Sequence, residues 1–147
     1  MAGIPAQEAI LGHVSVTRIN VVPVQELSDN FIMAEFFELP RIYALAVKAA
    51  HRDDRDIPEH YIMGEGHMRF FYNKLSYLVA RQAKLRAEGL RRGLKLTVDP
   101  KANVPSMFIL RSLTGFWWQD YIPTAEAIQL NRNRLAYRHR TIGGAYT

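Results

Sequence analysis

The sequence contains no cysteine, which excludes disulfide bonds, thiolate nucleophiles and metal sites with sulfur ligands. It also has no apolar run approaching the roughly 18–20 residues that a membrane-spanning helix needs. The segment from Met1 to Val16 includes Glu8 and lacks the basic start and long apolar stretch of a secretion signal. We therefore expect a cytoplasmic protein that does not enter membranes.

What the chain does contain fits one globular domain of 147 residues, of which 48% are hydrophobic and 22% charged. Residues 1–80 carry 7 Lys/Arg and 10 Asp/Glu, a balance of −3, whereas residues 81–147 carry 12 and 4, a balance of +8. A basic half of this kind indicates a surface for a polyanion such as nucleic acid. A solvated basic helix face accounts for the charge equally well, so charge alone leaves both interpretations open.

Apolar residues recur at helical spacing in three segments, the first of which begins near Ser28-Asp29. The apolar stripe of this predicted helix consists of Ile32, Phe36, Leu39, Tyr43 and Ala46. Glu35, Glu38 and Arg41 lie three residues apart, and we expect them to share a different face. Because the period continues past Pro40, this proline should bend the helix rather than end it.

A turn at Gly64-Glu65-Gly66-His67 leads into the second predicted helix, which Gly93 should end. Phe71, Leu75, Leu78, Gln82 and Leu85 mark one stripe of this helix, apolar except for the glutamine. Residues 94–119 show no regular period, and a third helix is expected from Pro123-Thr124 to about Tyr137. Since nothing alternates with the period of strands, we predict a compact all-α single domain of three principal helices with long ordered loops.

Several short blocks occur in the order found in one known family. They include Thr17-Arg18-Ile19-Asn20, Met33-Ala34-Glu35, Glu38-Leu39-Pro40-Arg41, Gly64-x-Gly66-His67, Phe70-Phe71-Tyr72-x-Lys74-Leu75 and Asp120-Tyr121-Ile122-Pro123. Together they resemble the pyrimidine-dimer DNA glycosylases of the phage endonuclease V type, over roughly residues 16–138. Several collinear blocks are far more specific than any one tetrapeptide.

The resemblance implies a DNA repair enzyme that cuts the glycosidic bond of a dimer's 5′ pyrimidine and then breaks the strand by β-elimination. In the family the nucleophile is the α-amine of a threonine exposed by methionine removal, and a glutamate on the first helix is essential. The matching positions are Thr17 and Glu38. The residues implied to contact the DNA backbone are Arg18, Arg41, Arg134 and Arg138. The expected partner is double-stranded DNA that contains damaged pyrimidines. We expect the protein to bind it as a monomer, in the nucleoid, and to need no metal or cofactor.

An α-amine suits this chemistry because only an imine makes the neighbouring sugar proton acidic enough to leave. A lysine with a pKa of about 10.4 is almost wholly protonated near neutral pH, whereas an α-amine at about 7.7–8.0 keeps a useful neutral fraction. Arg18 and Arg41 would lower the pKa of the amine further by like-charge repulsion. Glu38 would stabilise positive charge that develops on the sugar and would move protons around the imine.

Some of these residues have simpler interpretations. On spacing alone, Glu38 and Arg41 are more often a surface helix pair than a catalytic set. His67 is more often a capping or core histidine than a DNA contact. Trp117-Trp118 could stack on a base, although packing against the helices is commoner, and Phe70-Phe71-Tyr72 fits the core.

The sequence departs from the family pattern at three places. Phe31 and Phe37 stand where the phage enzyme has a histidine and an arginine, which removes polar contacts at the lesion. Residues 140–147 match the family's aromatic- and lysine-rich end poorly. Residues 1–16 precede Thr17, and an amine joined to Val16 in a peptide bond cannot form an imine.

We expect residues 1–16 to be an N-terminal extension absent from the mature protein or processed off it, leaving residues 17–147 as the glycosylase-like domain. A GTG codon encodes valine inside a reading frame but gives methionine when it is the start codon. We therefore expect Val16 to mark the true translation start of an over-extended reading frame. Proteolytic removal of the extension and loss of catalysis are the alternatives. The competing functions are a catalytically silent DNA-binding module and, third, a helical protein-interaction domain with a solubilising basic tail.

Overall fold

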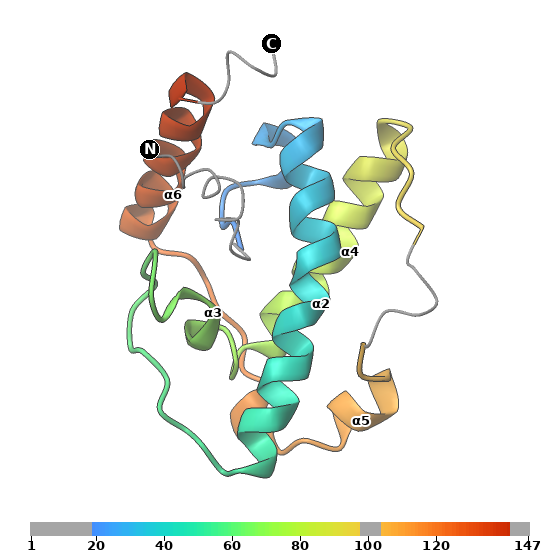
Figure 1. Cartoon of the computed structure of the whole chain (residues 1–147), viewed down its shortest axis with the longest axis vertical. Helices are drawn as coiled ribbons and strands as arrows, with labels where there is room; N and C mark the ends of the chain where they lie inside the picture. Colours follow the sequence, from blue (N-terminus) through green and yellow to red (C-terminus); the bar gives the residue numbers. More distant parts are fainter. Residues whose placement is uncertain (1–18, 98–103, 142–147) are drawn as a thin grey trace, which may run out of the picture.

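The computed structural model describes residues 19–97 and 104–141, and this part of the chain is all-α, as predicted (Figure 1). In chain order the elements are η2 (Val24–Glu26), α2 (Asp29–His51), α3 (His67–Phe70), α4 (Leu75–Arg91), α5 (Met107–Arg111), η3 (Gly115–Trp117) and α6 (Ala125–Thr141). The three long helices α2, α4 and α6 are the three principal helices that the sequence predicted. The described residues contain no β-strand, only an isolated antiparallel β-bridge between Lys74 and Trp118.

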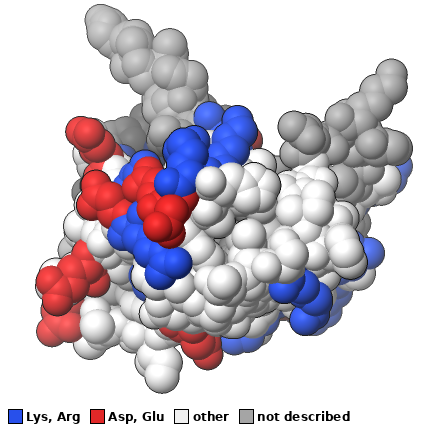
Figure 2. Space-filling view, turned by 90° about the horizontal axis from the view of Figure 1, so that it is seen from below, with Lys and Arg blue, Asp and Glu red and all other residues white. Residues whose placement is uncertain are grey.

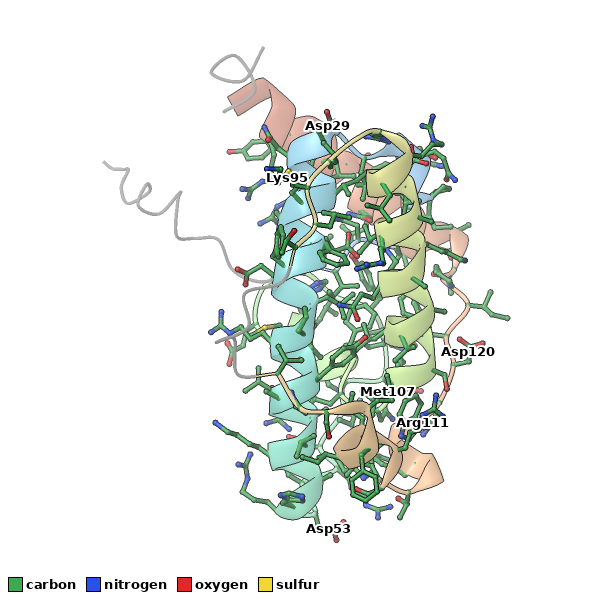
Figure 3. All side chains as sticks on the ribbon, turned by 90° about the vertical axis from the view of Figure 1, so that its right-hand side faces the viewer. Asp29, Asp53, Lys95, Met107, Arg111 and Asp120 are labelled. Atoms are coloured by element: carbon green, nitrogen blue, oxygen red, sulfur yellow. The ribbon has the colours of Figure 1, made fainter. Side chains whose placement is uncertain are left out.

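Helices α2 and α4 lie side by side, and their side chains fill the space between them (Figures 1 and 3). The Ser28 hydroxyl caps α2 by accepting a hydrogen bond of 3.3 Å from the backbone N–H of Phe31. The apolar stripe predicted for this helix is confirmed, because all five of its residues are buried. Pro40 lies inside α2 without ending it, as the continuing period indicated.

One predicted face of α2 is wrong. Glu35 does not share the exposed surface of Glu38 and Arg41, because it is buried in the core at 2% exposure. Position 35 borders the apolar stripe, and the buried guanidinium of Arg81 on α4 meets its carboxylate there. A buried charge is tolerated when an opposite charge and hydrogen bonds satisfy it.

The second and third helices differ from the prediction mainly at their ends. Gly66, with φ of 90°, leads into the short α3, and α4 itself begins only at Leu75. Gly93, with φ of 81°, follows the end of α4 as predicted. Helix α6 begins where expected, with the Thr124 hydroxyl accepting from the N–H of Ala127, and extends to Thr141.

The interval 94–119 is less irregular than predicted, since it contains α5 and η3. Both elements are too short to produce a helical period in the sequence. Trp117 is buried, and the indole N–H of Trp118 donates to the carbonyl of Leu110. The two tryptophans therefore pack in the protein, in agreement with the simpler interpretation.

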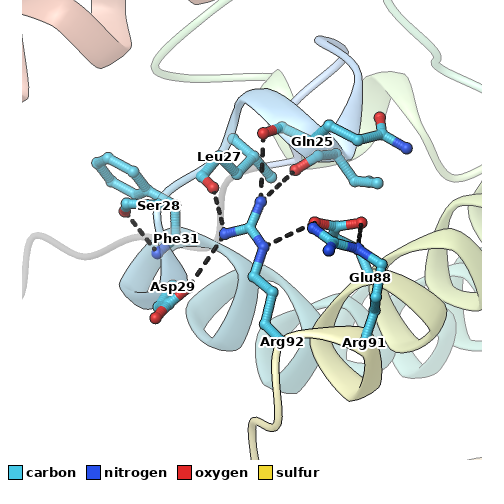
Figure 4. Close-up of polar contacts among 9 residues, drawn as sticks. Gln25, Leu27, Ser28, Asp29, Phe31, Glu88, Arg91 and Arg92 are labelled. Atoms are coloured by element: carbon cyan, nitrogen blue, oxygen red, sulfur yellow. Dashed lines mark hydrogen bonds and ion pairs between the residues drawn. The ribbon is translucent and has the colours of Figure 1, made fainter.

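The end of α4 is tied to the start of α2 by an ionic cluster (Figure 4). Arg92 donates to the carboxylates of Glu88 and Asp29 and to the carbonyl of Leu27. Hydrogen bonds from Arg91 and Arg92 lower the pKa of Glu88 to about 2. This cluster holds the segment between residues 24 and 29 against α4.

Candidate functional site

Residues 19–22 form a buried segment that has no regular secondary structure and is held by side chains of other elements. The N–H of Ile19 donates to Nε2 of His67 at 2.9 Å, and the hydroxyl of Tyr61 donates to the carbonyl of Ile19 at 3.2 Å. Nδ1 of His67 lies 2.7 Å from the carbonyl of Ile62, so it carries the proton and leaves Nε2 as the acceptor. His67 is thus a core histidine, which was the favoured interpretation.

A buried polar network continues from Asn20. Its amide donates to Oε1 of Glu35 at 2.9 Å, and Nε of Arg81 donates to Oε2 of the same carboxylate at 2.8 Å. Arg81 also donates to the carbonyl of Val22 at 2.6 Å. Burial alone lowers the pKa of Arg81, but the Glu35 carboxylate outweighs burial and holds it above the ordinary value.

Asn131 on α6 closes this network from the other side. Its Oδ1 accepts hydrogen bonds from the backbone N–H groups of Val21 and Val22, at 2.6 and 3.2 Å. Its Nδ2 donates to Oδ1 of Asn20 at 2.8 Å. Side chains from α2, α4 and α6 therefore converge on the four residues that directly follow Arg18.

The predicted catalytic residue Glu38 lies one helical turn beyond Glu35 on α2, where its side chain is 48% exposed. Arg41 lies one turn further, 60% exposed, with Nη1 3.9 Å from Oε1 of Glu38. Phe37 beside them is also exposed. A carboxylate, a guanidinium and an aromatic ring thus share an accessible part of α2.

The predicted DNA contacts Arg134 and Arg138 are half-buried on α6, three and seven residues after Asn131. These intervals recur on one side of a helix, so both arginines share the side of α6 that holds the buried segment. Arg132 lies on another side, where it makes hydrogen bonds of 2.6 and 2.9 Å to the Glu26 carboxylate. The other two predicted site residues, Thr17 and Arg18, lie outside the described residues.

The end of the molecule where α2 finishes is a poor place for a polyanion. Figure 2 views this end and shows basic and acidic groups mixed beside a broad uncharged area. In the loop after α2, Asp53 forms an ion pair with Arg55 at 2.8 Å, and Asp54 forms one with Arg69 of α3 at 3.1 Å. Charges of both signs cancel there, whereas a DNA backbone favours a surface of one sign.

Lys74 supplies a second amine with a perturbed pKa. Burial lowers its pKa to about 8, in the range of an α-amine. However, Nζ already donates to the carbonyl of Phe70 at 2.8 Å and to Oδ1 of Asn73 at 3.0 Å. It also lies 3.8 Å from the centre of the Phe70 ring. These contacts engage the N–H groups of its ammonium in the fold, which makes Lys74 a control for the nucleophile rather than a candidate.

Within residues 19–97 and 104–141, no group of three or more His, Asp or Glu side chains is placed to hold a metal ion. In the same residues no helix has the length and apolar character that crossing a membrane requires. Comparison with protein families gives a match over residues 16–101 to the family described as pyrimidine dimer DNA glycosylase. This match covers more than half of the chain and confirms the resemblance drawn from the short sequence blocks. The chain belongs to the pyrimidine dimer DNA glycosylase family.

Proposed function

We propose that the protein removes pyrimidine dimers from DNA as a combined glycosylase and abasic-site lyase, with the Thr17 α-amine as nucleophile and Glu38 as the catalytic carboxylate. The observation that carries this proposal is the attachment of Asn20 to Glu35, one helical turn from Glu38. Three helical residues span about 4.5 Å along the axis. Three residues of extended chain, the interval from Asn20 back to Thr17, reach at most about 10 Å. The α-amine of Thr17 therefore has the reach to meet the carboxylate of Glu38.

The covalent steps balance without a further reagent. The amine attacks C1′ of the dimer's 5′ nucleotide, and the glycosidic bond breaks with its electron pair leaving on the base nitrogen, which takes up a proton. The amine loses a proton and the sugar ring opens at O4′, which becomes a hydroxyl, so that C1′ and the amine nitrogen form an imine. Loss of a C2′ proton then expels the 3′ phosphate, and water hydrolyses the imine to return the amine. Glu38 is suited to stabilise charge at C1′ and to move these protons.

Binding of DNA is assigned to Arg18, Arg41, Arg134 and Arg138, each through the phosphate backbone. Phosphate contacts fix position and orientation, whereas they carry no base sequence. Such contacts suit a repair enzyme that must recognise a lesion in any sequence. The basic balance of the second half of the chain supports this assignment.

The proposal requires Thr17 to be the first residue of the active protein. In support, the family match begins at residue 16, next to Thr17. We therefore infer that residues 1–16 are an extension to a glycosylase domain of residues 17–147.

Borohydride trapping tests the proposal, because borohydride reduces an imine to a stable secondary amine. A chain beginning at Thr17 should give a covalent adduct with abasic DNA and with ultraviolet-irradiated DNA, and a chain beginning at Met1 should not. The Lys74→Gln variant of the shorter chain should still give the adduct, and peptide mapping should locate it on Thr17. If the adduct disappears in Lys74→Gln, the nucleophile is Lys74 and not Thr17. Tight, salt-sensitive DNA binding without any adduct would support the silent DNA-binding module instead.

A further inference from the structure

We propose that Asn131 on α6 is a positioning residue that holds the Thr17 amine in place for attack. This inference rests on the proposed function, and it concerns a helix that lies beyond the residues matched to the family. Asn131 is fully buried, and both ends of its side-chain amide are engaged by the segment of residues 20–22.

The first step of the argument is the geometry of the clamp. Oδ1 of Asn131 accepts from two consecutive backbone N–H groups, those of Val21 and Val22. Consecutive N–H groups of an extended chain point in opposite directions, so one acceptor for both fixes a local bend in the backbone. Both residues are at most 5% exposed, and without Asn131 their N–H groups would lack this acceptor in a dry environment.

The second step concerns the two residues that precede this bend. Asn20 is held between Asn131 and Glu35, and Ile19 is held by His67. A chain end fixed at four successive residues has few ways to move, whereas an unanchored chain end is commonly poorly ordered. For an amine nucleophile this matters, because a misplacement of about 1 Å can reduce a rate roughly 100-fold.

The third step links α6 to the substrate. Arg134 and Arg138, the proposed phosphate contacts, lie on the same side of this helix as Asn131. One rigid element therefore holds the phosphate contacts and the chain leading to the nucleophile at a fixed spacing. Asn131 acts through the backbone of residues 20–22 and does not itself touch the reacting atoms.

The test compares Asn131→Ala with Asn131→Asp in the chain that begins at Thr17. The alanine variant removes the acceptor for both N–H groups, whereas the aspartate variant retains it and sets a second carboxylate oxygen, in place of the amide donor, against Oδ1 of Asn20. Asn133→Ala is the matched control, because Asn133 lies on the same helix and is exposed, with Oδ1 accepting from Gln129. Each variant is assayed at saturating abasic DNA for the single-turnover rate of borohydride-trapped adduct, and separately for its dissociation constant and melting temperature.

We expect Asn131→Ala to slow adduct formation per folded molecule by roughly 10- to 100-fold. Its dissociation constant for DNA should stay within about threefold of wild type, because the phosphate contacts remain. Asn131→Asp should recover a rate within about fivefold of wild type, since it keeps the acceptor. A purely structural residue would change the melting temperature without this split between rate and binding.

An unchanged rate in Asn131→Ala, or a fall explained by weaker DNA binding, would overturn the positioning role while leaving the proposed function intact. If Asn131→Ala does not fold, Asn131→Asp decides the matter. An aspartate variant with unchanged binding, an unchanged melting temperature and a rate more than tenfold below wild type would mean that the N–H clamp does not set the rate. A wild-type chain that gives no adduct at all would refute the proposed function, and the positioning role with it.

Discussion

The buried ion pair between Glu35 and Arg81 leads to a quantitative prediction about stability. The two side chains are 1% and 6% exposed, and Nε of Arg81 lies 2.8 Å from Oε2 of Glu35. In Glu35→Gln one carboxylate oxygen becomes an NH₂ group, which would face the N–H groups of the guanidinium. Arg81 would then be a buried charge without compensation, a change that typically costs about 3–5 kcal/mol. For a domain of this size such a loss lowers the melting temperature by about 10–20 °C.

Glu38→Gln is the matched control, since it makes the same chemical change three residues away on the same helix. The ion pair of Glu38 is exposed and 3.9 Å long, and such pairs contribute about 0–1 kcal/mol. Thermal and urea unfolding followed by circular dichroism should therefore separate the two variants clearly. The double change Glu35→Leu with Arg81→Met should be less destabilising than Glu35→Gln, because it removes both charges together. Melting temperatures of Glu35→Gln and Glu38→Gln that agree within about 2 °C would refute this reasoning.

Four further outcomes are expected. Glu38→Gln should abolish glycosylase activity on irradiated DNA with little change in DNA affinity, and full activity would contradict its assigned role. Arg134→Ala should weaken binding to all DNA sequences and flatten the dependence of log affinity on log salt by about one unit in a titration from low to moderate salt. The pKa of Glu88 is depressed to about 2, so its ion pairs stabilise the fold at pH values above the ordinary carboxyl pKa. This stabilisation is lost as the pH falls toward 2. The melting temperatures of wild type and Glu88→Gln should therefore differ at neutral pH and converge in acid. Phe37→Arg, which restores a polar contact of the phage enzyme, should raise the rate on dimer DNA relative to that on abasic DNA, and an unchanged ratio of the two rates would contradict this.

The parts of the fold that follow from local signals were predictable from the sequence. Helix α2 has its own cap at Ser28 and an unbroken apolar stripe, so its start, type and buried side could all be predicted. Helix α5, with five residues, is shorter than the window in which a helical period can be recognised. The start of α4 was placed too early because the apolar pattern runs through Phe71, which belongs to the preceding turn.

In the candidate site, too, some residues could be predicted from the sequence and others could not. Glu38 and Arg41 were found through the family resemblance, and the structure places both on the accessible side of α2. The anchoring residues were missed because their partners are distant in the chain, with Val21 and Asn131 separated by 110 positions. One signal was present: each long helix carries a polar residue in or next to its buried side, namely Glu35, Arg81 and Asn131. Three such residues in three helices indicate a shared buried polar network, although the sequence alone does not say what it encloses.

The proposed use of a chain terminus as nucleophile would explain why this core accepts buried polar groups at all. An α-amine has a suitable pKa without burial, but it belongs to the part of a chain that is usually the least ordered. Apolar packing alone could bury the side chains of residues 19–22, but it would leave their backbone N–H and C=O groups without partners. Arg81, Asn131 and His67 satisfy backbone groups of Ile19, Val21 and Val22, and Glu35 holds the side chain of Asn20. These contacts also define where the chain enters the core. The buried polar residues are therefore explained together if the next residues toward the terminus must be held in one place beside Glu38.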